Sequence, residues 1–477
     1  MSLIFPRSAG LPILLSSLAL VVGCGTDAAD DDDTLTPEPT ATEAATPTAV
    51  PATPTAAPTP TSARCVAPAN DCDETVCPSE DDQEALQQAL IDAEDGDTVC
   101  MSDGIFYFYN EISLDVPNVT LKGAGPDSTI LDFTDQIQGG NGIHITADGC
   151  TVENFQVLDS PGDGIKASAV EGITYRDVSV FWTADAAADN GAYGLYPVSS
   201  SQVLIERCKV KGASDAGVYV GQSFDIIVQG NEAWGNVAGT EIENSTNAEV
   251  MDNHSHDNTG GVLVFNLPDL PVGDGKRAKV HDNIIENNNT PNFAPEGNIV
   301  SIVPQGTGLL ILATDENEFH DNIIRDNMSA GIAIFSYDET LIGEGWEDPS
   351  FDPYPERNYV HDNVFENNGY APKDIALVLF AALNAVSEET IRPPLPSILW
   401  DGCVNANFLG DPIEAEEPPV FLNCMSGNGD SLGSGGEIEG EATYANFAMC
   451  GEVPFEDYSF DIEPVTCTYT GLAPQSW

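Results

Sequence analysis

Five reactive side chains recur at one position of a repeated Gly-apolar-x-apolar unit, and together they carry the groups needed for proton transfer. They occupy the third place of the unit and are His144, Lys166, Tyr196, Tyr219 and Glu241. A base, an acid and two phenols on one surface are suited to proton abstraction or sugar binding. The alternative is a merely polar surface, because outward residues of any exposed sheet are polar.

Further polar and aromatic residues accompany this column. Asp163 and Asp215 stand just before their units, Glu243 lies two residues after Glu241, and Tyr193 precedes the glycine of its unit. Long insertions between units contribute Trp182, Trp346 and Tyr354. Insertions in repeat proteins often build the walls of a binding cleft, so we expect these seven residues to bind substrate. The alternative is that the aromatic loops close over an apolar face.

The unit itself indicates how these residues are positioned. The alternation predicts short strands, and a second repeated feature is an Asn column whose members lie 23, 30, 23, 22, 30, 39 and 41 residues apart. The column comprises Phe155, Val178, Cys208, Asn231, Asn253, Asn283, Asn322 and Asn363. Units of about 22 residues are too short for helical-pair repeats, so the sequence predicts an all-β, right-handed parallel β-helix with a buried Asn ladder.

A column of histidines is a weaker candidate site. His281, His320 and His361 each precede an Asp-Asn pair in successive repeats. Stacked imidazoles are able to bind Zn²⁺ or Cu²⁺, but a regular repeat produces such columns without any ligand, and a straight row does not form a tetrahedral cage. We therefore assign no metal to them, and the His-Ser-His at 254–256 does not change that expectation.

The first 63 residues resemble an export and anchoring segment. An apolar run after Arg7 ends in Val-Val-Gly-Cys, which is similar to a bacterial lipobox and makes Cys24 the expected lipidated residue. We expect a signal peptide over 1–24 and a disordered, Asp-rich and Thr/Pro/Ala-rich tether over 25–63. The location implied is the cell envelope, with lipid as the only membrane attachment.

The two ends of the expected solenoid need caps, because open sheet edges aggregate. An N-terminal cap is expected over 64–113, with a helix in which Ser79 is the N-cap and Leu86, Ala89, Leu90 and Ala93 form an apolar stripe. The β-helix is expected over 114–384 and an irregular C-terminal cap over 385–477. Each end holds four cysteines that are able to form two disulfides, whereas Cys150 and Cys208 are expected to be buried free thiols.

The charge balance limits the partners. Seventy-seven acidic residues against 15 basic ones exclude nucleic acid and argue against a polyanion held in a basic groove. No cofactor is required by any motif. Ca²⁺ remains an open expectation because carboxylates are abundant, although no calcium loop has the required spacing.

Several phrases resemble a family of exported bacterial parallel β-helix repeat proteins of unestablished activity. They include "GLYPVSSSQVLIERC", "GTEIENSTNAEV" and "NTGGVLVFNLPDLPV", and the resemblance covers about residues 80–400. It implies a partner, since genes of that family lie beside those of an exported c-type cytochrome family. Mannuronan C5-epimerases share the fold, but their Tyr-Gly-Phe-Asp-Pro-His signature reads "YGLYPV" here, with Tyr196 and Val198 in place of the catalytic Asp and His.

Two functions follow as hypotheses. In the first, the protein binds or modifies extracellular polysaccharide on the face from His144 to Glu241, and any activity is that of a lyase, epimerase or hydrolase. In the second, it is a non-catalytic surface scaffold that docks a partner protein such as the cytochrome.

Overall fold

The computed structural model describes residues 65–337, 345–378, 381, 393–405, 422–447 and 462–475. All of them belong to the unit Ala63–Trp477, to which the following description applies. The signal peptide, Cys24 and the tether lie outside the described residues.

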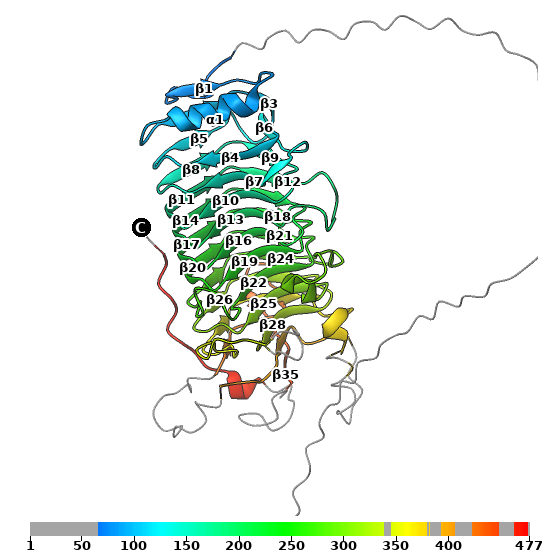
Figure 1. Ribbon diagram of the computed structural model, residues 1–477. Coiled ribbons are helices and arrows are strands. Elements are labelled where there is room, and N and C mark those ends of the chain that lie inside the picture. The colour runs from blue at the N-terminus through cyan, green and yellow to red at the C-terminus, as the bar shows by residue number, and fades with distance from the viewer. Residues whose placement is uncertain are drawn as a thin grey trace, which may run out of the picture. The chain divides into compact units, whose positions relative to one another are not determined.

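The chain winds through three parallel sheets, one strand of each per coil, and the coils stack along one axis (Figure 1). The twelve-stranded sheet contains β1 Glu74–Val76, β2 Thr98–Met101, β5 Thr120–Lys122, β8 Cys150–Glu153, β11 Glu171–Arg176, β14 Ser201–Glu206, β17 Phe224–Gln229, β20 Thr246–Met251, β23 Lys279–His281, β26 Glu318–His320, β29 Tyr359–His361 and β32 Cys424–Ser426. The eleven-stranded sheet contains β4 Asn110–Leu114, β7 Gln138–Ile145, β10 Asp163–Ser168, β13 Tyr193–Val198, β16 Ala216–Gly221, β19 Ala238–Glu243, β22 Gly260–Phe265, β25 Thr307–Leu312, β28 Ala330–Phe335, β31 Ile398–Trp400 and β35 Tyr444–Asn446. The ten-stranded sheet contains β3 Gly104–Tyr107, β6 Thr129–Asp132, β9 Gln156–Leu158, β12 Ser179–Phe181, β15 Lys209–Lys211, β18 Glu232–Trp234, β21 His254–His256, β24 Ile284–Glu286, β27 Ile323–Arg325 and β30 Val364–Glu366.

A few short elements accompany the three sheets, besides the helical residues 374–378. They are the helix α1 Asp82–Asp92, the 3-10 helices η1 Ile299–Ile302 and η3 Glu463–Val465, and the antiparallel pair β33 Ser431–Leu432 and β34 Ile438–Glu439. None of the helices among the described residues is long and apolar enough to cross a membrane. The three sheets extend beyond the expected bounds 114–384 at both ends, because β1 to β4 and β31, β32 and β35 also belong to them.

The predicted alternation and Asn ladder are both confirmed. The second and fourth residues of each Gly unit point into one continuous core, as Ile165, Leu309 and Ile332 do with no exposed surface. In the ladder, the side-chain amide of Asn322 donates to Asn363 Oδ1 at 2.9 Å, and its Oδ1 accepts from Asn283 Nδ2 at 2.9 Å. The predicted column ended at Asn363, and this is wrong: Asn363 Nδ2 donates to Asn428 Oδ1 at 3.0 Å, so Asn363 has an Asn neighbour on both sides.

Two more Asn ladders occupy the other corners of the coils. Asn236, Asn258, Asn288, Asn327 and Asn368 form one between the ten- and eleven-stranded sheets. Asn317, Asn358 and Asn423 form the other. Residues just before ladder amides, such as Asp282, Asp321 and Asp362, have φ between 53° and 55°, a region that short Asp and Asn side chains tolerate. In the recurring "HDN", the Asp therefore adopts the left-handed conformation at the corner of the coil, and the Asn that follows it belongs to the ladder.

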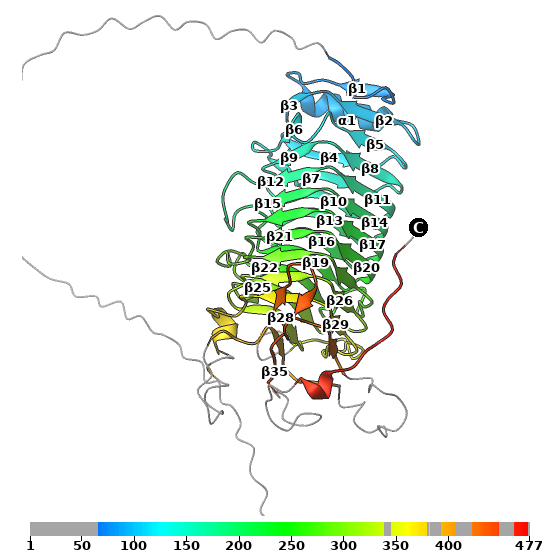
Figure 2. The same cartoon turned by 180° about the vertical axis from the view of Figure 1, so that it is seen from behind.

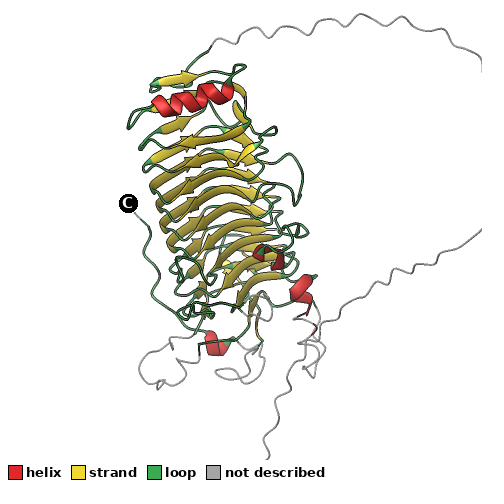
Figure 3. Ribbon diagram, viewed as in Figure 1, coloured by secondary structure: helices red, strands yellow, loops and turns green. Residues whose placement is uncertain are grey.

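The helix α1 covers the first coil, as predicted (Figure 3). Leu86, Ala89 and Leu90 are buried, but the helix begins at Asp82 with Asp81 as N-cap, and Ser79 lies outside it. The Asp82 carboxylate instead accepts the N–H groups of Ser79 and Tyr107.

Gln87 of the same helix protects the sheet edge. It accepts from the N–H of Ser113 at 2.9 Å and donates to its carbonyl at 3.0 Å, so it occupies the hydrogen bonds that a further strand would make to β4. This edge would otherwise be free to pair with another chain.

Disulfides fix both ends. Cys65 pairs with Cys77, Cys72 with Cys100, and Cys424 with Cys467. Cys403 is also disulfide-bonded, and Cys450, the fourth cysteine of the C-terminal region, lies outside the described residues. Cys150 and Cys208 are buried free thiols, as predicted. Disulfides of this kind persist in oxidising compartments outside the cytosol.

The C-terminal segment runs back along the twelve-stranded sheet, across several coils (Figure 2). Beyond the disulfide of Cys467, the Leu472 N–H donates to Glu318 of β26 at 2.6 Å, and the Gln475 N–H donates to Glu249 of β20 at 2.7 Å. Between Cys467 and Leu472, the ring of Tyr469 packs against that of Tyr359 of β29. The segment is therefore attached to β32 by the disulfide and to β20 by the hydrogen bond to Glu249. Three strands of the sheet, β29, β26 and β23, lie between these two attachment points.

Candidate functional site

The five predicted residues lie on consecutive strands of the eleven-stranded sheet and in register. Lys166 of β10 aligns with His144 of β7 on one side and with Tyr196 of β13 on the other. Tyr219 of β16 aligns with Glu241 of β19. The Gly units therefore place the whole column on the outer face of one sheet.

The first half of the column is open to solvent. The side chains of His144 and Lys166 retain 29% and 26% of their surface, and that of Asp163 retains 15%. Lys166 Nζ lies 3.7 Å from Asp163 Oδ2 and 4.3 Å from the centre of the Tyr196 ring. A ligand at this position meets a cation, a carboxyl group and an aromatic ring together. We name Asp163, Lys166, Tyr196 and His144 the open patch.

Three tyrosines form the boundary between the open patch and the next coils. The ring centres of Tyr193, Tyr196 and Tyr219 lie 4.5 to 4.9 Å from one another. The Tyr219 hydroxyl donates to Glu243 Oε2 at 2.5 Å. Burial raises the pKa of the Tyr196 hydroxyl to about 12, and nearby carboxylates add to this shift. The phenols therefore remain protonated donors at neutral pH.

The carboxyl groups of this face hold protons more tightly than exposed ones. Burial raises the pKa of Asp163 to about 6, even though Lys166 acts in the opposite direction. Burial also raises the pKa of Asp215 to about 7, and the charges of Glu243 and Asp163 add to it while a hydrogen bond from Tyr193 opposes it. A carboxyl group that titrates near neutral pH is suited to give or take a proton from a bound molecule.

The second half of the column is enclosed, which corrects the expectation that it faces solvent. Tyr219 is 4% exposed and Glu241 is 2% exposed. Val300 and Val303, from the insertion that contains η1, pack with the outer-face residues Tyr219 and Leu263 in one apolar cluster. Periodicity cannot reveal this cover, because the insertion interrupts the repeat.

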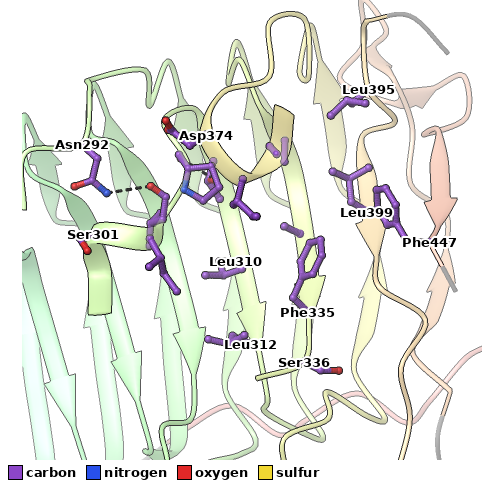
Figure 4. A pocket seen from close by; sticks show the side chains of 18 residues that line it. Asn292, Ser301, Leu310, Leu312, Phe335, Ser336, Asp374, Leu395, Leu399 and Phe447 are labelled. Carbon is purple, nitrogen blue, oxygen red and sulfur yellow. Dashed lines mark hydrogen bonds between the residues drawn. The ribbon is translucent and has the colours of Figure 1, made fainter. Parts of the chain in front are cut away.

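Two cavities lie under and beside the cover. A small one of about 50 Å³ is lined by Tyr193, Asp215, Glu241 and Glu243 together with apolar residues. A larger one of about 520 Å³ lies farther along the same face, between β25, β28, β31 and the η1 insertion (Figure 4). Its lining is mainly apolar and includes Leu310, Phe335, Leu399 and Phe447. The sequence did not indicate it, because Leu399 and Phe447 come from the region expected to be an irregular cap.

Residues 141–290 match the family described as the right handed beta helix region. The protein is a right-handed parallel β-helix. No curated protein matches the chain.

Solved structures similar to this β-helix include two polysaccharide-acting enzymes and a phage protein. The A-module of the Azotobacter vinelandii mannuronan C-5 epimerase AlgE4 is 16% identical over 78% of this chain and 98% of its own, with a TM-score of 0.45. The Thermotoga maritima exopolygalacturonase is 12% identical over 62% and 88%, with a TM-score of 0.43. The N-terminal fragment of bacteriophage Phi29 gene product 12 is 13% identical over 76% and 63%, with a TM-score of 0.47.

The aromatic residues of the insertions are placed differently from our expectation. Trp182 is 3% exposed in the main core of the β-helix, and its Nε1–H donates to the Ser160 carbonyl at 2.7 Å, so it does not reach a ligand on the outer face. Trp346 packs edge to face against Tyr337 and Phe351. Tyr354 is half-buried in the same loop. For Trp346, the alternative that these loops close over an apolar face is the one observed.

The histidine column is already engaged with carboxylates. The rings of His281, His320 and His361 stack with centres 4.8 and 4.9 Å apart. Each Nδ1 bonds to the carboxylate of the following Asp at 2.7 Å. The Nε2 atoms of His281 and His361 bond to Glu249 and Glu318, each at 3.0 Å. The Nε2 of His320 is buried without a hydrogen-bond partner. This stack lies on the twelve-stranded sheet, separate from the open patch.

Proposed function

We propose that the open patch binds extracellular polysaccharide and that Asp163 exchanges a proton with the bound sugar. The observation that carries this proposal is the position of Asp163: a carboxyl group with a pKa of about 6 lies beside Lys166 at the edge of the tyrosine cluster. The tyrosine ring supplies a flat apolar face for a sugar ring, and the charged groups supply hydrogen bonds to its hydroxyls. The net charge of −62 favours a neutral glycan over a polyanionic one.

Removing the Lys166 ammonium tests the binding. We expect Lys166→Ala to raise the Kd for a neutral polysaccharide at least about tenfold, because the variant loses one hydrogen bond to a charged group. The matched control is Lys209→Ala, which removes an exposed lysine of the ten-stranded sheet. The measurement is a glycan array followed by titration calorimetry, with and without Ca²⁺, since we propose that Ca²⁺ assists binding at these carboxylates. Equal affinities of the two variants for the glycan would exclude the open patch as its binding site.

Asp163→Asn separates binding from chemistry. The variant keeps the shape of the side chain but cannot titrate, so turnover of a bound glycan should be lost while its Kd stays within about twofold. The readout is release of reducing ends from a neutral glycan between pH 5 and pH 8. Unchanged turnover in this variant would contradict the proposed proton transfer by Asp163. The proposal that the open patch binds a glycan would then be decided by the Lys166→Ala variant alone.

The charge balance supports a second candidate function. A chain with 77 acidic and 15 basic residues attracts basic proteins, as expected of a scaffold for a partner such as an exported c-type cytochrome. Salt-sensitive co-purification with a basic protein and no affinity for any glycan would favour this function over the first.

A further inference from the structure

The outer face of the ten-stranded sheet carries two histidines between two glutamates. His254 and His256 lie two residues apart on β21, and their ring centres are 4.1 Å apart. Glu232 of β18 aligns with His254, and Glu286 of β24 aligns with His256. One ligand atom from each of Glu232, His254 and His256 lies within 4.8 Å of the other two.

Both glutamates are oriented by cations on their far side. Lys209 Nζ binds Glu232 Oε2 at 2.8 Å, and Glu232 Oε1 faces His256 Nε2 at 3.5 Å. Arg325 Nε donates to Glu286 Oε2 at 2.5 Å, and Glu286 Oε1 lies 2.9 Å from His254 Nε2. Each carboxylate therefore presents its other oxygen to an imidazole.

Of these four residues, His256 has a ring nitrogen that lacks a hydrogen-bond partner. Its Nδ1 lies 2.7 Å from Asp257 Oδ2, and a carboxylate accepts, so Nδ1 carries the proton. Its Nε2 is inaccessible to solvent and has no hydrogen-bond partner. In the neutral ring this nitrogen holds a lone pair that faces the Glu232 carboxylate, an arrangement that a cation between them would stabilise. A carboxylate bonded to the far nitrogen of an imidazole is also the usual support of a metal-binding histidine.

We propose that His254, His256 and Glu232 bind one divalent transition metal ion, with His256 coordinating through Nε2 and with Glu286 or water completing the shell. Two imidazoles and a carboxylate are ligands that Zn²⁺ and its neighbours in the series prefer. The site lies on a different sheet from the open patch and does not depend on the proposed glycan function. It also differs from the His281 column, where two of the three Nε2 atoms are bonded to glutamates.

The test is titration of the tag-free full chain with Zn²⁺, and with Co²⁺ for its visible spectrum, at 0.15 M salt with excess Mg²⁺ to occupy the acidic surface. We expect one tight site per chain and a Co²⁺ spectrum typical of tetrahedral nitrogen and oxygen ligands. His256→Ala should weaken Zn²⁺ binding at least about 100-fold. Asp257→Asn should weaken it about 10-fold, because it removes only the support of the imidazole.

His320→Ala is the matched control, since it removes a stacked histidine of the other column. Its Zn²⁺ affinity should equal that of the unchanged protein. Thermal unfolding of each variant without metal confirms that the fold is retained, and Glu232→Gln provides a second variant with nearly the same shape. The proposal is overturned if the tight site is absent, or if it persists in both His256→Ala and Glu232→Gln.

Discussion

Replacing Asn322 by Leu should lower the free energy of unfolding by about 4 kcal/mol, since each buried polar group left without a partner costs about 1–3 kcal/mol. The Asn322 side chain makes four hydrogen bonds: its Oδ1 accepts from the N–H and the Nδ2 of Asn283, and its Nδ2 donates to the Val280 carbonyl and to Asn363 Oδ1. Leucine satisfies none of these groups, and the site has no exposed surface through which water could replace it. Chemical denaturation followed by circular dichroism measures the change.

Asn363→Leu should cost about as much as Asn322→Leu, because Asn363 is also bonded on both sides. The matched control is Asn70→Leu, the same replacement at an exposed position, which should change stability by less than about 0.5 kcal/mol. A much smaller cost at Asn363 than at Asn322 would contradict the continuation of the ladder to Asn428.

The folded protein should be more stable at pH 5.5 than at pH 8, by about 3 kcal/mol for each of two buried carboxyl groups. Burial raises the pKa of Asp315 to about 8, although a hydrogen bond from the Glu356 N–H opposes this shift. Burial also raises the pKa of Glu356 to about 8, and the charges of Asp315 and Asp352 add to it. In the unfolded chain these groups titrate at about 4. Between pH 4 and 8 the folded state therefore binds more protons than the unfolded state, and stability decreases as pH rises through this window.

At lower pH a group with a lowered pKa acts in the opposite direction and makes the folded protein less stable as the pH falls. The pKa of Glu286 is lowered because hydrogen bonds from Arg325 and His254 outweigh its burial, so its contribution to stability is lost as the pH falls through that lowered pKa. Asp315→Asn should raise stability at pH 8 and flatten the pH dependence, whereas Asp103→Asn, at an exposed position, should leave both unchanged. Thermal unfolding between pH 5 and pH 8 measures this, and an identical slope in the Asp315 variant would contradict the assignment.

The periodic part of the molecule could be predicted from its sequence, because each repeat carries its own local signals. A glycine followed by alternating apolar residues marks a strand, and Asp-Asn marks a corner, so the ladder and the reactive column follow from spacing alone. The second Asn ladder carries an equally regular signal, five residues after the first, at Asn288, Asn327 and Asn368. Our prediction used only the first Asn of each repeat and therefore did not include the second ladder.

The enclosed half of the column could not be predicted in the same way. Tyr219 and Leu263 are covered by an insertion whose contacts depend on side-chain packing across the face, and no period in the sequence records them. The placement of Trp182 shows the same limit: an aromatic residue at the start of an insertion belongs to the core of its own coil. The pairing of His256 with Glu232 required the register of two strands, which the spacing of His-Ser-His alone does not give.

The C-terminal segment that returns along the twelve-stranded sheet changes the order in which the coils unfold. In a stack in which each coil touches only its neighbours, the end coil is the first to fray, and unfolding proceeds from it one coil at a time. Here the last residues are covalently tied at Cys424 and hydrogen-bonded at Glu249, so the end coil is held to a coil deeper in the stack. Peeling the terminal coils must first extract this segment, so coils β20 to β32 are expected to open as one cooperative block, detectable as a single step when the chain is pulled from its C-terminus.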